Sequence, residues 1–495
     1  MKRAHCLEQA ISRSRFDLVV IGGGATGLGV AWDASLRGLS VLLLEGGDFA
    51  GGTSSRSTKL IHGGIRYLRQ GHLDLVRESL LEKTWLLQQA PQLVRPMRFV
   101  IPCRNRWESL VYGIGTSIYS WLGHSRSHRL SKSQLEQRFP GLCAARFVGG
   151  VDYPDAQFDD ARMAITLAQQ IHATGGIVLN YCPVEALGEF DGSARTVSIV
   201  DSCSGKRHAF PASMVVNATG VQSDRIRRWV VPEAPPRIRA SRGSHLVVRG
   251  RVLGSQQDAL IIPKTEDGRV IFVIPWLGRS LIGTTEVEIS DAEAPPRAAP
   301  AEVDYLLHHV EPYLAKPLGR ADVTSVFAGY RPLISRASRG ASSQLVRDFE
   351  IEQTGPRVLS VLGGKWTTFR AMAEVAVDRV IQLLELSPIP CRTRKVMLRE
   401  NHLESQSDAD LDEPLTAEFP YHWKQICQAI RHEMAISLDD VLARRTRCLF
   451  LDVAATRAIA PQVARFMALE LGHSETWESS ELARFDLIAR QYEVP

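Results

Sequence analysis

The chain has 495 residues, of which 44% are hydrophobic and 23% are charged. This is the composition of an ordinary globular protein, and it excludes a collagen-like, coiled-coil or wholly disordered chain. The formal net charge of +5 is less basic than is usual for a dedicated nucleic-acid-binding protein, so we expect no nucleic-acid partner. None of the eight cysteines forms a Cys-x-x-Cys pair, and we therefore expect no metal site of the zinc or iron–sulfur kind.

The chain opens with a predicted strand–helix–strand unit. Phe16 to Ile21 is a short apolar run, which is typical of a buried parallel strand. Ala25 to Arg37 is predicted to be a helix, and Ser40 to Glu45 a second buried strand. This order of elements predicts an α/β domain at the start of the chain. A further helix is predicted over Leu73 to Gln89.

The turn between the first strand and its helix carries a glycine-rich motif. Gly22-Gly23-Gly24-Ala25-Thr26-Gly27 fits the dinucleotide-binding pattern G-x-G-x-x-G. Gly22 permits the tight turn, Gly24 lets the backbone approach a pyrophosphate, and Gly27 lets the helix pack closely. The helix amides bind the anionic pyrophosphate. Glu45, at the end of the second strand, can accept hydrogen bonds from the adenosine ribose.

Three later segments favour FAD over NAD as the dinucleotide. Thr53-Ser54-Ser55 supplies hydroxyl groups suited to a phosphate or to a ribityl chain. Val215-Val216-Asn217-Ala218-Thr219-Gly220 is a strand that runs into a turn of small residues, where a backbone can pass close to a cofactor. Leu359-Ser360-Val361-Leu362-Gly363-Gly364-Lys365 is a strand followed by a glycine pair and a helix N-terminus, which can stabilise negative charge on a reduced flavin ring. Together, and in this order, the three segments indicate FAD.

The middle of the chain changes character. Ala259 to Pro263 and Arg269 to Pro275 are apolar runs, and the turn between them contains Asp267-Gly268, which is a hairpin signal. Leu246 to Val248 and Leu281 to Glu288 are predicted companion strands. An antiparallel sheet inserted into an α/β chain predicts a substrate-binding domain.

The remainder of the chain, beyond an acidic stretch, is predicted to be helical. Ser437 to Asp440 has capping-box spacing ahead of a predicted helix over Val441 to Arg447. The expected fold is thus an α/β FAD-binding Rossmann-type domain with an inserted antiparallel-sheet substrate domain and a C-terminal helical domain. The predicted boundaries are residues 14–95, 150–232 and 325–388 for the FAD-binding domain, 96–149 and 233–324 for the substrate-binding domain, and 392–495 for the helical cap domain.

Several ordered motifs carry a resemblance to one flavoprotein family. They are Thr53 to Leu68, Gly243-Ser244-His245, Phe272 to Trp276, Gly283 to Val287, Tyr330 to Leu333, Arg347-Asp348 and Gly364 to Arg370. With these motifs the chain resembles the FAD-dependent, quinone-linked glycerol-3-phosphate dehydrogenases, within the D-amino-acid-oxidase-like flavoproteins. The resemblance runs from Asp17 to about Arg370, and more weakly through Leu438 to Arg447. Within this family, the chain resembles the compact, bacterial aerobic type.

The resemblance implies oxidation of sn-glycerol 3-phosphate to dihydroxyacetone phosphate, by hydride transfer to FAD, with the electrons passed to a membrane quinone. A phosphate needs positive charge, which Arg supplies through paired hydrogen bonds. The resemblance implies that Arg66 and Arg347 hold the substrate phosphate, with Tyr67 alongside. It also adds cofactor-binding residues: Gly63, Gly64, Lys365 and Thr367.

The reaction requires a base for the 2-hydroxyl proton of the substrate. His245 is the first candidate, because imidazole titrates near neutral pH. Lys365 is the second, if neighbouring cations lower its pKa. Arg331 is expected to polarise the hydroxyl group and to stabilise the developing alkoxide.

The resemblance also implies a peripheral protein on the cytoplasmic face of the inner membrane. Arg95 to Arg129 holds six arginines against the single acid Glu108. Aromatic and apolar side chains interleave with the arginines: Trp107, Val111, Tyr112, Ile114, Ile118, Tyr119 and Trp121. Cationic and aromatic character together suit an anionic membrane surface. A solvated basic surface over a partly buried helix is an equally weighted interpretation.

Two other functions stay open at this point. One is an FAD-dependent oxidase that passes electrons to oxygen, acting on glycerol 3-phosphate or on a 2-hydroxy or amino acid. The other is a flavin-bound scaffold, or a partner in RNA modification, without catalysis of its own. For the C-terminal domain, a cap over the active site, a homodimer contact and a membrane contact are all compatible with the sequence.

Overall fold

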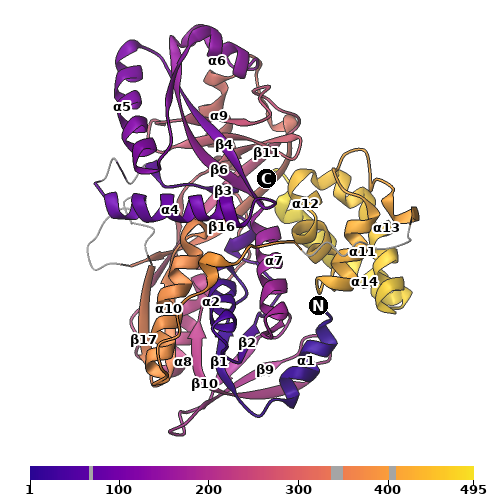
Figure 1. Ribbon diagram of the computed structural model, residues 1–495. Coiled ribbons are helices and arrows are strands. Elements are labelled where there is room, and N and C mark those ends of the chain that lie inside the picture. The colour runs from indigo at the N-terminus through magenta and orange to yellow at the C-terminus, as the bar shows by residue number, and fades with distance from the viewer. Residues whose placement is uncertain (66–67, 69–70, 336–348, 401–408) are drawn as a thin grey trace.

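The computed structural model describes residues 1–65, 68, 71–335, 349–400 and 409–495. Figure 1 shows two sheets with helices around them, and a group of C-terminal helices to one side. The expected combination of a Rossmann-type sheet, a second and largely antiparallel sheet and a helical C-terminal domain is confirmed.

The first sheet contains the predicted opening unit. β1 (Phe16–Ile21) pairs in parallel with β2 (Val41–Leu44) on one side and with β10 (Arg207–Asn217) on the other. β10 in turn pairs in parallel with β18 (Val358–Gly363). Strands covered on both faces are largely apolar, as β2 is throughout and β1 is apart from Asp17 near its start. The other strands of this sheet are β7 (Ile177–Leu179), β8 (Val184–Leu187), β9 (Arg195–Val200) and β17 (Phe349–Gly355).

Three helices pack together beside the first sheet: α2 (Ala25–Leu36), α7 (Asp160–Ala173) and α10 (Phe369–Leu383). Gly29 allows α2 to approach α10, because a Cβ there would lie 2.9 Å from the Phe369 ring. α1 (Arg3–Ser12) contacts β7 and β10, and α8 (Ser223–Val230) contacts β10, β17 and β18.

The second sheet contains the predicted hairpin. β12 (Asp258–Ile262) and β13 (Ile271–Trp276) pair antiparallel, and the Gly268 N–H donates to the Thr265 carbonyl in the turn between them. The strand predicted over Leu246 to Val248 is confirmed as part of β11, whereas the strand predicted over Leu281 to Glu288 is divided between β14 and β15, with residues 284–286 in neither. The remaining strands are β3 (Leu60–Ile61), β4 (Val94–Cys103), β5 (His128–Ser131), β6 (Gly149–Phe158), β11 (Ile238–Val248), β14 (Arg279–Gly283), β15 (Val287–Ile289) and β16 (Val323–Ile334).

Among the described residues, the helices around this sheet include α4 (Leu73–Gln89), α5 (Arg106–Leu122), α6 (Lys132–Arg138) and α9 (Pro300–Val310). The helix predicted over Leu73 to Gln89 is thereby confirmed. The domain boundaries predicted before residues 150 and 325 fall at the starts of β6 and β16, which both belong to the second sheet. The division into domains stays a prediction.

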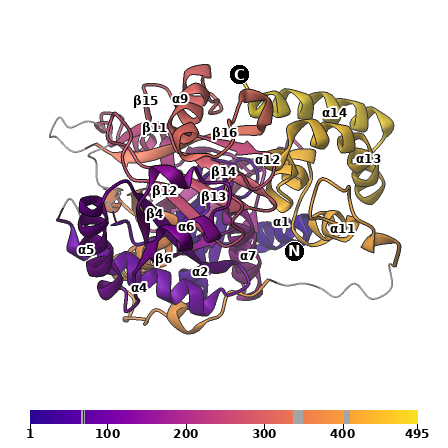
Figure 2. The same ribbon diagram turned by 90° about the horizontal axis from the view of Figure 1, so that it is seen from above.

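The C-terminal helices lie together beside both sheets, as Figure 2 also shows: α11 (Trp423–His432), α12 (Cys448–Leu451), α13 (Val453–Leu471) and α14 (Glu475–Ala489). Phe450 of α12 packs on Phe327 of β16, with ring centroids 4.8 Å apart. In the part of the chain that the structure describes, no helix has both the length and the apolar character needed to cross a membrane.

The helix expected over Val441 to Arg447 is confirmed in part, together with its capping box: the Asp440 N–H donates to Ser437 Oγ and the Ser437 N–H donates to Asp440 Oδ2, but the helix is of the π type and ends at Arg445. The structure has a π-helical turn over Asp440–Arg445, in which the Thr446 N–H donates to the Val441 carbonyl five residues earlier, at 2.8 Å. The physical reason is the burial of charged side chains, because Arg444 and Arg445 both reach acids that lie outside the turn.

Candidate active site

The carboxyl ends of β1, β2, β10 and β18 border a cavity of about 620 Å³. This is where open α/β sheets bind ligands, and the volume falls within the roughly 300–1,000 Å³ usual for small-molecule sites. The second sheet closes the other side of the cavity, through His245 of β11 and through residues 329–334 of β16.

The glycine motif is built to receive a pyrophosphate. Gly22 has a φ of +109°, and a Cβ there would lie 2.6 Å from the Ala218 carbonyl oxygen. A Cβ on Gly27 would lie 1.9 Å from the Gly22 carbonyl oxygen, so only glycine allows α2 to start here. Gly24 stands at the N-cap of α2 and has no side chain to cap it, while the Ala25 N–H donates to Ser54 Oγ at 2.9 Å. The N-terminus of α2 faces the cavity, and a helix N-terminus favours an anion.

Glu45 follows β2 and lines the same cavity. Its carboxylate accepts hydrogen bonds from the Gly23 N–H at 2.6 Å and from the Gly47 N–H at 2.9 Å. Burial raises the pKa of Glu45, while these two N–H groups oppose the rise. The carboxylate thus joins the glycine motif to the loop after β2, where an adenosine ribose is expected.

The structure brings most of the predicted cofactor residues to this cavity. Those that line it are Gly22, Gly24, Ala25, Thr26, Glu45, Thr53, Ser54, Ala218, Thr219, Gly220, Gly363, Gly364, Lys365 and Thr367. Four others do not line it: Gly27, Ser55, Gly63 and Gly64. Two of the four make contacts that hold the loops, because the Ser55 carbonyl accepts from Lys59 Nζ and the Gly63 N–H donates to the Tyr119 hydroxyl.

His245 lies on the cavity wall and is almost fully buried. Its Nε2 lies 2.9 Å from Thr58 Oγ1, and its ring stacks on Phe327 with centroids 4.7 Å apart. Within the described residues, His245 Nδ1 has no hydrogen-bond partner. Burial, followed by the charges of Arg331 and Lys59, lowers the pKa of His245 well below its usual value. The imidazole is therefore neutral at physiological pH, which is the state that a base requires.

Arg331 lies on the adjacent strand, opposite Ser241 and four residues along from the position that pairs with His245. Its guanidinium donates to Thr284 Oγ1 at 2.7 Å and to the Thr285 carbonyl at 3.2 Å. A Cβ on Gly243 would lie 2.2 Å from Arg331 Nη2, so glycine at that position makes room for the guanidinium. The charge of Arg331 is thus held at the cavity wall, near the imidazole.

The other predicted site residues divide into two groups. Lys365 lines the cavity, and its Nζ donates to Ser79 Oγ at 2.6 Å. Arg66, Tyr67 and Arg347 lie outside the described residues, and their assignment to the substrate phosphate stays a prediction.

Sequence reasoning missed a buried ion pair behind the cavity. Lys59 Nζ donates to Asp160 Oδ2 at 2.7 Å, and both side chains are fully buried. Burial lowers the pKa of Lys59 to about 8, although Asp160 opposes the change. Asp160 also accepts from the Ser57 N–H and from Arg447. Lys59 lies within the motif Thr53 to Leu68 that carries the resemblance, whereas no pattern in the sequence indicates the role of Asp160.

Comparisons with known proteins agree with this geometry. The family model described as FAD dependent oxidoreductase matches residues 17–379, and the model described as the C-terminal domain of alpha-glycerophosphate oxidase matches residues 392–478. The chain is 34% identical to a probable mitochondrial glycerol-3-phosphate dehydrogenase of Caenorhabditis elegans, over 95% of this chain and 72% of that protein. It is also 34% identical to glycerol-3-phosphate dehydrogenase 2 of Mycobacterium bovis, over 96% of this chain and 87% of that protein.

A solved structure is similar over nearly the whole chain. It is the glycerol-3-phosphate dehydrogenase from Bacillus halodurans complexed with FAD, with a TM-score of 0.78 and 27% identity, covering 99% of this chain and 97% of that one. The fold and the glycine-lined cavity define a FAD-dependent oxidoreductase, and within that class the chain belongs to the glycerol-3-phosphate dehydrogenase family. FAD is its cofactor.

Proposed function

We propose that the protein oxidises sn-glycerol 3-phosphate to dihydroxyacetone phosphate and passes the electrons to a membrane quinone. One observation carries the substrate part of this proposal: the buried His245 and the cationic Arg331 line the same cavity as the glycine motif. When bound, FAD supplies the hydride acceptor. The family membership supports the choice of a phosphorylated polyol as the hydride donor.

Each residue then has a separate task. His245 takes the proton of the 2-hydroxyl group as C2 loses its hydride, because the imidazole is neutral. Thr58 fixes the ring through its hydrogen bond to Nε2. Arg331 stabilises the negative charge that develops on the hydroxyl oxygen. A cationic guanidinium near the imidazole also disfavours early protonation of the ring.

The first test is a reduction of the flavin without an acceptor. We expect anaerobic addition of sn-glycerol 3-phosphate to bleach the absorbance of the bound, oxidised flavin. Dithionite serves as the control that the flavin can be reduced. An oxidised spectrum that persists with glycerol 3-phosphate, but bleaches with a 2-hydroxy or amino acid, would show that the substrate has been assigned wrongly.

The proposed route to a quinone rests on the outer face of α5. Side chains on that face are apolar and exposed: Trp107, Leu110, Val111, Ile114, Ile118 and Trp121. Their spacing follows the helical repeat, and α5 lies at the edge of the molecule in both views (Figures 1 and 2). Arg104 and Arg106 are exposed at the start of the helix, Arg126 is exposed after its end, and Arg129 of β5 is exposed beside Gly113 in the middle of the helix. Apolar and cationic side chains together fit the surface of an anionic bilayer.

Tyr119 does not belong to this face, although the sequence grouped it with the other aromatic residues. It is fully buried, because its hydroxyl donates to Asp155 Oδ1 at 2.7 Å and accepts from the Gly63 N–H.

We expect the protein to sediment with anionic lipid vesicles at low salt and to be released at high salt. Because two large aromatic anchors would be lost, replacing Trp107 and Trp121 together by serine is expected to reduce the bound fraction severalfold. Leu469→Ser is a matched control, since Leu469 is 77% exposed on α13, away from α5. Absence of vesicle binding at low salt would show that the proposed membrane contact is wrong.

Oxygen is the alternative acceptor, because the model matching residues 392–478 is named for an alpha-glycerophosphate oxidase. Measuring hydrogen peroxide formation under air distinguishes oxygen from a quinone as the electron acceptor. A quinone-linked enzyme is expected to turn over with a soluble quinone analogue and to release little hydrogen peroxide. Stoichiometric peroxide from glycerol 3-phosphate would favour the oxidase.

A further inference from the structure

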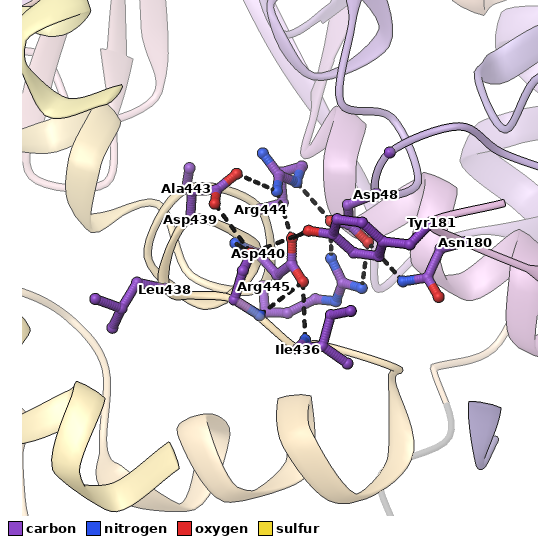
Figure 3. Close-up of polar contacts among 12 residues, drawn as sticks. Asp48, Asn180, Tyr181, Ile436, Leu438, Asp439, Asp440, Ala443, Arg444 and Arg445 are labelled. Atoms are coloured by element: carbon purple, nitrogen blue, oxygen red, sulfur yellow. Dashed lines mark hydrogen bonds and ion pairs between the residues drawn. The ribbon is translucent and has the colours of Figure 1, made fainter. Parts of the chain in front are cut away.

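The loop after β2 has two sides. Gly46, Gly47 and the residues 50–52 line the cofactor cavity, directly after Glu45. Asp48 does not line it, and its side chain is fully buried. Figure 3 shows the Asp48 carboxylate among side chains of the C-terminal segment. The same loop therefore faces FAD on one side and the C-terminal domain on the other.

Two arginines of the π-helical turn hold Asp48. Arg444 Nε donates to Asp48 Oδ2 at 2.5 Å. Arg445 makes paired hydrogen bonds to the same carboxylate, Nη2 donating to Oδ1 at 2.8 Å and Nη1 to Oδ2. Burial alone would raise the pKa of Asp48, but the charges of Arg445 and Arg444 outweigh it and lower the pKa. The carboxylate is therefore ionised and fully paired.

The C-terminal domain fixes both guanidinium groups in turn. Arg444 Nη2 donates to Asp439 Oδ2 and to Asp440 Oδ1, each at 2.6 Å. Arg445 Nη2 also donates to the Glu433 carbonyl at 2.7 Å. Because these partners are buried, the two arginines form a rigid support for Asp48 and cannot simply follow its movements.

On the opposite side, the loop is joined to the glycine motif. The Ala50 N–H donates to the Gly23 carbonyl at 2.9 Å, and the Gly47 N–H donates to the Glu45 carboxylate. Ala50 has a φ of +57°, a conformation that L-residues rarely adopt and that surrounding contacts must maintain. A shift of Asp48 would therefore move backbone that faces the ribose side of the cofactor.

We propose that Asp48 is a positioning residue for FAD, through which Arg444 and Arg445 of the C-terminal domain hold the loop that binds the adenosine half of the cofactor. Asp48 acts through the backbone on either side of it and does not touch FAD. The proposal rests on FAD as the cofactor, and it is independent of the substrate and of the electron acceptor proposed above.

The test measures FAD affinity and needs no turnover. Apoprotein of the Asp48→Asn variant is titrated with FAD, and the quenching of FAD fluorescence gives the dissociation constant. Asparagine keeps the shape of the side chain but loses the charge that pairs with both arginines. We expect the dissociation constant to rise about 10–100-fold, the range found at metal sites when a residue that orients a ligand without touching the metal is removed.

Arg484→Gln is the matched control. Arg484 belongs to the same ionic cluster, with hydrogen bonds to Asp439 and Glu481, but it makes none to Asp48 within the described residues. We expect this variant to lower the melting temperature of the apoprotein while leaving the FAD dissociation constant unchanged. An equal loss of FAD affinity in both variants would mean that general destabilisation explains the effect, and would overturn the proposal.

A second variant covers the case in which Asp48→Asn does not fold. Arg445→Lys keeps the positive charge but cannot make the paired hydrogen bonds to the carboxylate. We expect a folded Arg445→Lys protein to bind FAD about tenfold more weakly. If the folded Arg445→Lys variant binds FAD as tightly as the unmodified chain, the paired hydrogen bonds to Asp48 do not contribute to FAD binding and the proposal is wrong.

Discussion

Replacing His245 by alanine is expected to lower kcat by about 10²–10⁴-fold, the range that a positioned general base contributes. FAD should stay bound, because His245 reaches the cavity from the second sheet and the glycine motif lies on the first. Anaerobic stopped-flow measurement of flavin reduction isolates this step from reoxidation. His308→Ala is the control, since His308 is exposed on α9.

The pH dependence of kcat/KM is a second test of His245 as the base. Burial and two cations lower the pKa of His245 below 6.5, so the base stays unprotonated at neutral pH and is lost only as the pH falls below that value. The acid limb of kcat/KM is therefore expected below pH 6.5 and is expected to vanish in His245→Ala. The folded state also loses stability as the pH falls below 6.5, because the unfolded chain then binds the proton more readily. If the flavin of His245→Ala is reduced at a nearly normal rate, another group must accept the proton of the 2-hydroxyl group, and Lys365 is the next candidate.

Asp160→Asn is expected to lower the free energy of unfolding by about 3–5 kcal/mol, as is usual when one partner of a buried ion pair is removed. The change leaves the cations of Lys59 and Arg447 in an apolar interior without their shared carboxylate. Chemical unfolding followed by far-UV circular dichroism measures the loss. Asp412→Asn is the control, because the ion pair of Asp412 with Lys424 is exposed and no measurable change is expected.

The same variant should slow flavin reduction. Asp160 accepts from Ser57 Oγ and from Lys59, and these residues flank Thr58, which contacts His245. We expect reduction to slow about 10–100-fold at saturating substrate. A destabilised variant that reduces its flavin at the normal rate would show that the ion pair stabilises the fold without positioning the base.

Local patterns predicted those parts of the fold that depend on near neighbours. The strand at Phe16 to Ile21 and the turn at Gly22 to Gly27 are set by burial and by glycine geometry, which a single segment reveals. The hairpin around Asp267-Gly268 is likewise local. His245 and Arg331 were predicted only through the resemblance, because 86 positions separate them and only the pairing of β11 with β16, which sets Arg331 opposite Ser241, puts them on neighbouring strands.

Long-range ionic contacts could not be predicted. Asp160 has the sequence appearance of an acid in the first turn of a helix, and nothing near it indicates Lys59 as its partner. Arg444 and Arg445 look like surface residues of an amphipathic helix, and only the π-helical turn brings both to Asp48. Tyr119 was misplaced for a similar reason, since its partner Asp155 lies on a different element.

The distance along the chain between Asp48 and Arg445, 397 positions, has a consequence for biosynthesis. At the usual rates of translation, about 5–20 residues per second, the arginine leaves the ribosome roughly 20–80 s after the aspartate. During that interval the nascent cofactor loop lacks the cations that hold it. The loop therefore reaches its final shape only when synthesis is nearly complete, and tight capture of FAD belongs to the last stage in the making of the protein.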